Sequence, residues 1–366
     1  MLDTLHLEPG GDQMTQATSS GLDGVVVAET AISDVDGEHG RLVIAGEPVE
    51  QLAPHGFEAA AARVLAAGGL AIAGELREAL GRARVTAFEH VPRLGDALDA
   101  SDGMDALRAA LGHLRSAGDD ATDAVAAIGA AAVFVSGWSR RRRGEPAIAP
   151  DPARSHAADY LRMTRGTPGD AAQERALDTY LATVIDHGMN ASTFTARVVT
   201  STASDLISAV VAGVGALKGP LHGGAPGPVL DMLDAIGEPS HAEAWLLGEL
   251  AAGRRIMGMG HRIYRVRDPR AAVLEEAVRP LASPRLGLAR AVEQAAAKIL
   301  RDRKPDRPLA ANVEFYTAVL LDAVGLPREQ FAPTFAVGRV AGWSAHVCEQ
   351  RRTGRLIRPA SRYVGD

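Results

Sequence analysis

The chain has 366 residues, 46% of them hydrophobic, and carries a formal net charge of −6 at pH 7. This length supports the core of two domains or one large one, and the acidic balance argues against broad nucleic-acid binding, which usually needs a basic surface. The lone cysteine, Cys348, excludes a disulfide framework and a cysteine-rich metal site, and the lack of an apolar span or signal segment predicts a cytoplasmic protein with no membrane span.

The N-terminal region is the only part of the chain in which we predict strands. Residues 1–20 are polar and lack periodicity, which predicts a flexible tail. Residues 24–44 contain two β-branched runs around the turn DVDGEHG, which predicts a small hairpin. After Pro54 the pattern turns helical almost to the end, so the predicted fold class is all-α with a short N-terminal hairpin.

The helical segments are mostly closed by a glycine or a turn. Residues 119–139 are nearly apolar all round and are therefore expected to be buried. The Pro-rich stretch 140–153 predicts a connector, and Ser155 is expected to cap the helix that follows it. We predict helices over residues 57–69, 73–85, 104–116, 119–139, 155–166, 172–219 (two long helices that break near Gly188), 289–303, 312–325 and 335–354.

Three of the 11 histidines stand out because they lie beside glycines that let the backbone bend tightly: His187, His222 and His261. His187 is expected to end an apolar helix and to share a face with Asn190, three residues later. His222, in GPLHGG, precedes a helix expected after Pro226, and a helix N-terminus disfavours imidazolium.

His261, in GMGH, precedes four arginines whose charges also favour the neutral ring. For each of these three histidines the alternative is a structural histidine in a turn. We interpret the other histidines as ordinary tail, surface or half-buried residues. A metal site is not expected, because the usual histidine and carboxylate spacings are missing.

Arginines supply the second pattern. Arg270, Arg339 and Arg358 each lie beside a turn or a small-residue helix, and guanidinium groups bind carboxylates bidentately. Together with the neutral histidines, these three arginines predict a pocket that binds a small polycarboxylate containing a carbonyl group. Solvated surface arginine is the better interpretation of Arg140–Arg143. Glu314 lies in an apolar segment, where desolvation would raise its pKa and suit it to take a proton from carbon.

These motifs together resemble the citrate synthase family. The resemblance is close over roughly residues 120–366, and residues 21–42 also resemble the family's N-terminal hairpin. The matching stretches are RRRRGEPAIAPDP, DHGMNASTFTARVVTSTASDL, GALKGPLHGGAPGPVLDML, GMGHRIYRVRDPRA, NVEFYTAVLLDAVGLP and FAVGRVAGWSAHVCEQ.

The resemblance implies an all-α homodimer in which a small domain closes over the substrates. The implied large domain comprises residues 21–223 and 326–366, and the implied small domain comprises residues 224–325. The implied reaction condenses an acyl-CoA with oxaloacetate and then hydrolyses the thioester. Acetyl-CoA is the expected donor, with propionyl-CoA and a 2-methylcitrate product as the close alternative. A paralogue that binds CoA esters or oxaloacetate without catalysis is the third interpretation.

The resemblance also implies a role for each site residue. His222 would hydrogen-bond the thioester carbonyl, His261 would polarise the oxaloacetate ketone, and Glu314 would take the methyl proton. Glu314 departs from the aspartate usual in the family, and residues 45–115 also depart from the family pattern. The implied oxaloacetate contacts are His187, Arg270, Arg339 and Arg358, the last reaching in from the other subunit, and the implied CoA contacts are Arg265, Gly258 and Gly260. No metal or organic cofactor is implied, because CoA enters as part of a substrate.

Overall fold

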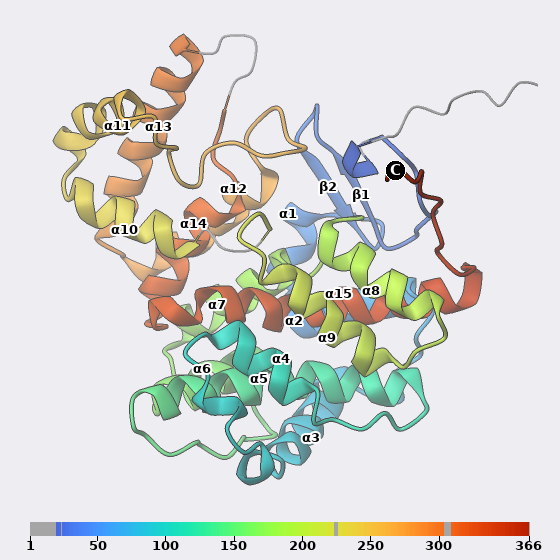
Figure 1. The fold of residues 1–366 in the computed structure, drawn as a ribbon. Coiled ribbons are helices and arrows are strands. Elements are labelled where there is room, and N and C mark those ends of the chain that lie inside the picture. Colours follow the sequence, from blue (N-terminus) through green and yellow to red (C-terminus); the bar gives the residue numbers. More distant parts are fainter. Residues whose placement is uncertain (1–19, 23, 223–225, 304–308, 366) are drawn as a thin grey trace, which may run out of the picture. The chain divides into compact units, whose positions relative to one another are not determined.

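The computed structural model describes residues 20–22, 24–222, 226–303 and 309–365 (Figure 1). The chain divides into two compact units, residues 1–30 and 31–366. In the first, Ser20–Leu22 form a short 3₁₀ turn and residues 24–30 have no regular secondary structure. The predicted tail, apart from residue 20, lies outside the described residues.

The predicted hairpin is confirmed and gains a third, very short strand. The antiparallel order is β1-β2-β3, and the first pair runs from Ser33 opposite Ile44 to Asp36 opposite Arg41. The β-branched run at residues 25–27 is not part of it. The strands are β1 (Ser33–Asp36), β2 (Arg41–Ile44) and β3 (Glu47–Pro48).

Helices form nearly all the regular structure in the remainder of the described chain, which confirms the predicted fold class. Most predicted helices are present within a few residues of their expected ends. The helices are α1 (Val49–Leu52), α2 (Phe57–Ala67), α3 (Leu76–Phe88), α4 (Gly103–Leu111), α5 (Asp120–Arg142), α6 (His156–Arg165), α7 (Ala171–Thr183), α8 (Ala191–Ser201), α9 (Leu206–Leu217), α10 (Pro226–Ile236), α11 (Ala242–Ala251), α12 (Pro269–Val278), α13 (Arg285–Arg303), α14 (Val313–Ala323) and α15 (Phe331–Thr353).

Side-chain caps fix where many of these helices begin. The expected cap at Ser155 is confirmed, since its hydroxyl accepts the Ala158 backbone N–H at 3.3 Å. The segment expected to form one helix after Gly188 is instead α8 and α9. Ala203 adopts a positive φ of 65° between them, and the Asp205 side chain caps α9. The Asp205 cap therefore starts a new helix inside a segment whose apolar pattern predicted one continuous helix.

Helix α5 is the core helix that the sequence predicts. By length and composition it could cross a membrane, but 78% of its most apolar window is buried inside the protein. It packs against α3, α4, α6 and α15, which explains why it is apolar on all sides. It extends to Arg142, so the connector begins later than expected.

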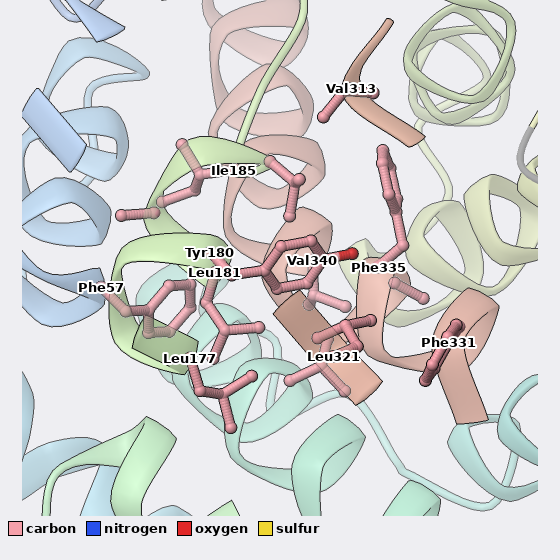
Figure 2. Close-up of a cluster of buried hydrophobic side chains, with 14 of the residues drawn as sticks. Phe57, Leu177, Tyr180, Leu181, Ile185, Val313, Leu321, Phe331, Phe335 and Val340 are labelled. Atoms are coloured by element: carbon pink, nitrogen blue, oxygen red, sulfur yellow. The ribbon is translucent and has the colours of Figure 1, made fainter. Parts of the chain in front are cut away.

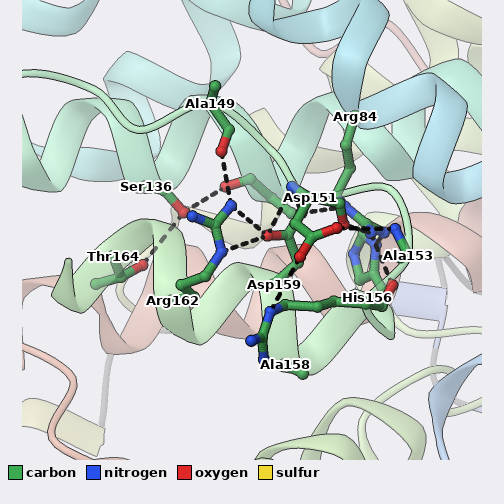
Figure 3. Close-up of polar contacts among 12 residues, drawn as sticks. Arg84, Ser136, Ala149, Asp151, Ala153, His156, Ala158, Asp159, Arg162 and Thr164 are labelled. Atoms are coloured by element: carbon green, nitrogen blue, oxygen red, sulfur yellow. Dashed lines mark hydrogen bonds and ion pairs between the residues drawn. The ribbon is translucent and has the colours of Figure 1, made fainter. Parts of the chain in front are cut away.

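A buried charge network holds the connector against α3 and α6 (Figure 3). The Asp159 carboxylate accepts the Arg84 Nε–H at 2.8 Å, Arg162 at 2.7 and 3.0 Å and the Asp151 backbone N–H at 3.1 Å. His156 stacks on Phe57 and is fully buried, which contradicts its interpretation as a surface or half-buried residue. Burial, followed by the Arg84 charge, holds the pKa of His156 well below its usual value.

The part of the core that carries the candidate site lies where α7, α14 and α15 meet (Figure 2). Leu177 and Leu181 of α7 pack with Leu321 of α14 and with Val340 of α15. Apolar packing on this scale contributes roughly 1.5–3 kcal/mol per large side chain and fixes the three helices as a rigid base.

Helices α10, α11, α13 and α14 pack on one another within residues 226–323. They fall in the segment predicted as the small domain, and its boundaries remain a prediction. The first boundary, at residues 223 and 224, lies outside the described residues.

Candidate active site

Four chain segments bring the predicted residues together. They are the turn after α7 with His187, the turn after α9 with His222, the loop 256–268 with His261, and α15 with Arg339. The rings of His187 and His261 lie 5.4 Å apart in an edge-on arrangement. Burial, followed by the charges of Arg270 and Arg339, holds the pKa of His187 well below its usual value.

The backbone of its own loop fixes the tautomer of His261. The Nδ1 atom of His261 accepts the backbone N–H groups of Ile263 at 3.0 Å and Tyr264 at 3.2 Å. An Nδ1 that accepts carries no proton, so the neutral ring must carry its proton on Nε2. Burial, and then the Arg270 charge, lowers the pKa of His261 to about 4. The neutral ring is therefore confirmed, although we expected several arginines rather than burial to be the main cause.

His222 has the opposite tautomer. Its Nε2 accepts the Ser192 backbone N–H at 3.2 Å and lies 2.8 Å from the Ser192 hydroxyl. The proton of the neutral ring therefore lies on Nδ1. The single proton of that hydroxyl is shared between His222 Nε2 and Asn190 Oδ1, 2.7 Å away, and the hydroxyl oxygen accepts the Trp343 indole N–H at 3.2 Å. The sequence analysis did not identify Ser192 as the residue that orients His222.

The pKa of His222 is lowered to about 4, as its predicted neutral state requires. Burial is the main cause and the Arg339 charge is the second. The predicted effect of the start of the following helix on this pKa remains a prediction.

The turn that carries His187 differs from the prediction. Helix α7 ends at Thr183, so His187 lies in an extended turn and does not share a helical face with Asn190. Asn190 instead caps α8 through its Oδ1. The Nε2 of His187 lies 3.1 Å from the Tyr264 hydroxyl.

Arg270 is buried and held in place by Asp268. The carboxylate accepts the Nε–H at 3.0 Å and an Nη2–H at 2.7 Å. Asp268 also caps α12 and accepts the Val313 backbone N–H at the start of α14. Burial, the largest single effect, would lower the pKa of Arg270, but the charge and hydrogen bonds of Asp268, with smaller contributions from Tyr264 and Glu314, together raise that pKa. Sequence reasoning missed Asp268, although the DPR motif contains it.

Arg339 offers a donor with no partner in the described part of the chain. Its Nε–H donates to the Val184 carbonyl at 2.6 Å, and its guanidinium lies 4.7 Å above the Phe335 ring centre. Its Nη2 is buried without a hydrogen bond to any described residue. A buried unpaired donor costs about 1–3 kcal/mol, so an anionic ligand at this point is favoured. Burial lowers the pKa of Arg339 to about 10.

Glu314 lies on the first turn of α14, half-buried, beside the segment that Asp268 anchors. Its backbone N–H donates to the Asn312 side chain at 3.0 Å. Its charge raises the pKa of Arg270 and of Tyr180, so the carboxylate lies within electrostatic reach of both. The predicted raised pKa of Glu314 itself remains a prediction.

The predicted CoA segment is a tight loop that only glycine fits. Gly258 and Gly260 have φ of 71° and 88°, and a Cβ at either position would lie 2.9 Å from a side-chain carbon. The loop is pinned to residues 309–312, where the Gly260 N–H donates to the Ala310 carbonyl at 2.7 Å. Arg265 has an exposed side chain on the outside of this loop.

Arg358 is not brought into this group by the described chain. It lies in the extended segment 354–365, and its side chain is exposed. The segment is tethered where the Ile357 N–H donates to the Ser201 hydroxyl at 3.0 Å.

A buried network beneath the site was also missed. Arg197 donates to His346 Nδ1 at 3.0 Å, which leaves the His346 proton on Nε2, 3.2 Å from Asp186 Oδ1. Asp186 precedes His187 and accepts the Gly188 backbone N–H at 3.1 Å. His346 is fully buried, which contradicts its interpretation as a surface or half-buried residue. The network holds the turn that carries His187.

Comparison with known proteins gives one consistent result. A family model described as citrate synthase, C-terminal domain, matches residues 21–360. The chain is 38% identical to putative citrate synthase 2 of Mycobacterium tuberculosis over 352 residues, covering 94% of this chain and 92% of that protein. It is 37% identical to 2-methylcitrate synthase of the same organism over 364 residues, covering 94% and 90%.

A solved structure agrees with the family model. It is the ternary complex of citrate synthase from Thermoplasma acidophilum with carboxymethyl coenzyme A and oxaloacetate. The match has a TM-score of 0.83 and 27% identity, and covers 96% of this chain and 97% of that one. The family model, the relatives and the fold therefore agree that this chain is an enzyme of the citrate synthase family.

Proposed function

We propose that the protein condenses acetyl-CoA with oxaloacetate and hydrolyses the resulting thioester to citrate and CoA. The observation that carries the proposal is the set of opposite tautomers in two neutral histidines. The proton lies on Nδ1 in His222 and on Nε2 in His261, and buried Arg270 and Arg339 lie within electrostatic reach. Neutral donors and buried cations suit a dianionic keto acid whose carbonyl must be polarised.

The first step removes a proton from the acyl methyl group. The Glu314 carboxylate takes this proton, and the electron pair moves to the thioester carbonyl, leaving an enol or enolate. His222 Nδ1–H donates to that carbonyl oxygen. A neutral imidazole of low pKa stabilises the developing charge by hydrogen bonding without providing a full positive charge.

The second step forms the carbon–carbon bond. The nucleophilic carbon attacks the ketone carbon of oxaloacetate, and His261 Nε2–H donates to the ketone oxygen as it becomes an alkoxide. The alkoxide becomes a hydroxyl by gaining one proton, which balances the proton that Glu314 took from the methyl group and leaves Glu314 ionised again. Arg270, Arg339 and His187 hold the two carboxylates. A water molecule then attacks the thioester carbonyl, the carbon–sulfur bond breaks, and the CoA thiol leaves with a proton.

The acyl chain is tested by comparing two donors. One additional methylene in an apolar pocket changes selectivity by only about 1–3 kcal/mol, or roughly 5- to 150-fold. With purified protein and oxaloacetate, we expect kcat/KM for thiol release to be at least about 5-fold higher with acetyl-CoA than with propionyl-CoA. A higher value with propionyl-CoA would assign the protein as a 2-methylcitrate synthase, the alternative that its 37% identity to 2-methylcitrate synthase of M. tuberculosis supports.

Domain closure and dimerisation belong to the same proposal. Residues 224–325 would form the small domain, with His222 just before its start and Glu314 near its end, so that closure would bring base and donor together and exclude water. Arg358 would complete the oxaloacetate site of the partner subunit in a homodimer. Its exposed side chain in an extended C-terminal segment supports a role outside its own subunit.

A mixing experiment tests this assignment. Arg358→Ala and Glu314→Gln homodimers should each be nearly inactive. After the subunits exchange, the mixed dimer has one site with both Glu314 and an incoming Arg358, so activity should recover to roughly a quarter of wild type, because half of the dimers are mixed and each has one of two sites intact. Failure to recover, despite subunit exchange shown by mass spectrometry, would place Arg358 in its own subunit's site or outside the site.

A further inference from the structure

One tyrosine lies against both histidines that face oxaloacetate in the proposed function. The Tyr264 ring centre lies 4.8 Å from that of His261 and 5.5 Å from that of His187. The side chain is buried, with 3% of its surface exposed. None of the roles proposed for the other site residues accounts for a buried phenol at this position.

The main chain and the side chain of Tyr264 act on different rings. Its backbone N–H donates to His261 Nδ1 at 3.2 Å, and its hydroxyl lies 3.1 Å from His187 Nε2. The first contact keeps the proton of His261 on Nε2. The second contact decides the tautomer of His187.

The phenol is the donor in that second contact. Burial raises the pKa of Tyr264 and lowers that of His187, so the phenol keeps its proton and the imidazole is neutral. A phenol donates a hydrogen bond more readily than it accepts one, and an unprotonated imidazole nitrogen is a good acceptor. His187 Nε2 is then unprotonated, and Nδ1 carries the proton.

The position of the tyrosine is set by close backbone packing. The Arg265 N–H donates to the Gly37 carbonyl at 2.9 Å, which joins the loop to the turn of the hairpin. A Cβ at Gly37 would lie 2.5 Å from the Ile263 carbonyl oxygen, so this approach needs glycine. The hairpin therefore supports the loop on both sides of Tyr264.

We infer that Tyr264 is a positioning residue that sets opposite tautomers in His187 and His261, with its hydroxyl fixing His187 for oxaloacetate. The inference rests on the proposed function for the identity of the keto acid. Tyr264 acts through His187, so its loss affects keto-acid binding more than the chemical step.

The test is Tyr264→Phe, which removes the hydroxyl and keeps the ring and the backbone contact. A net buried hydrogen bond contributes about 0.5–1.5 kcal/mol, so the Kd for oxaloacetate in calorimetry should rise about 2- to 12-fold. The KM for oxaloacetate should rise by a similar factor, and kcat should fall less than about 2-fold. Tyr160→Phe is the matched control. The Tyr160 hydroxyl is also buried, and it lies 2.7 Å from the Thr334 hydroxyl and 2.7 Å from the Gln330 amide nitrogen, neither of which is a proposed site residue.

Nitrogen NMR of labelled histidines gives a readout that a purely structural role would not change. In the wild-type protein His187 should show an unprotonated Nε2 and His261 an unprotonated Nδ1. In the Tyr264→Phe variant only the His187 signals should change.

An unchanged Kd, or a protonated Nε2 on His187 in the wild type, would overturn the inference. Calorimetry and NMR need no turnover, so they remain decisive even if wild-type protein releases no thiol and the proposed function fails. If oxaloacetate does not bind at all, the NMR assignment alone decides.

Discussion

Replacing Glu314 with glutamine is expected to lower kcat for thiol release about 10²- to 10⁴-fold, the range that a positioned general base contributes. The amide keeps the size of the side chain but cannot accept a proton from carbon at neutral pH. Oxaloacetate binding should change little, because the arginines and histidines remain. The measurement is steady-state thiol release, with oxaloacetate calorimetry on the same preparation.

Glu243→Gln is the matched control. Glu243 lies in the first turn of α11, as Glu314 lies in the first turn of α14, and it is exposed. Both substitutions remove a negative charge near a helix N-terminus, which costs about 0.3–1 kcal/mol in helix stability. Only the Glu314 variant should lose turnover; full turnover in that variant would remove Glu314 from the mechanism.

A shorter acid at the same position separates charge from reach. Glu314→Asp keeps the carboxylate and withdraws it by one methylene. A displacement of about 1 Å can cost on the order of 100-fold in rate, so a site fitted to glutamate should slow by about 10- to 100-fold. A faster Glu314→Asp enzyme would instead show that glutamate is the compromise in this chain.

The second large effect is expected from Asp268→Ala. The carboxylate is fully buried and balances Arg270, whose side chain is 3% exposed. Removing it leaves a buried charge and the Val313 backbone N–H without their partner. Breaking a buried pair in this way costs about 3–5 kcal/mol in the free energy of unfolding. Urea denaturation measures that loss.

The same substitution should weaken oxaloacetate binding by more than about 10-fold, since Arg270 loses the anchor that orients it. Asp99→Ala is the control, because the pair of Asp99 and Arg141 is about half-exposed. Such pairs contribute about 0–1 kcal/mol. A stability loss no larger for Asp268→Ala than for Asp99→Ala would contradict the assigned role of Asp268.

The candidate site residues could be predicted from the sequence because each lies in a short motif of consecutive residues. Each motif places a functional side chain beside a turn or helix start that favours glycine or proline, as in GPLHGG, GMGH and DPR. Composition and periodicity also predicted the helical fold and the buried α5.

The partners that set the chemistry could not be read in this way. Ser192 on α8 orients His222, which follows α9. The contacts from Arg197, also on α8, through His346 on α15 reach Asp186 in the turn after α7. These contacts join residues far apart in sequence, so local spacing carries no signal of them. The shift in the pKa of His261 was predicted correctly in direction but assigned to arginines, because burial is a property of the folded chain.

The most direct test of the central claim is whether CoA thiol release depends on oxaloacetate. Purified protein is given acetyl-CoA with and without oxaloacetate, and the thiol and the organic acid are both quantified. A condensing enzyme should release thiol only when oxaloacetate is present, form one citrate per thiol, and turn over in the ordinary range of about 1–10³ per second. Thiol release without oxaloacetate would contradict the claim that the protein is a condensing enzyme. The absence of release from both acetyl-CoA and propionyl-CoA, by protein that still binds oxaloacetate, would also contradict that claim and would favour a binding protein.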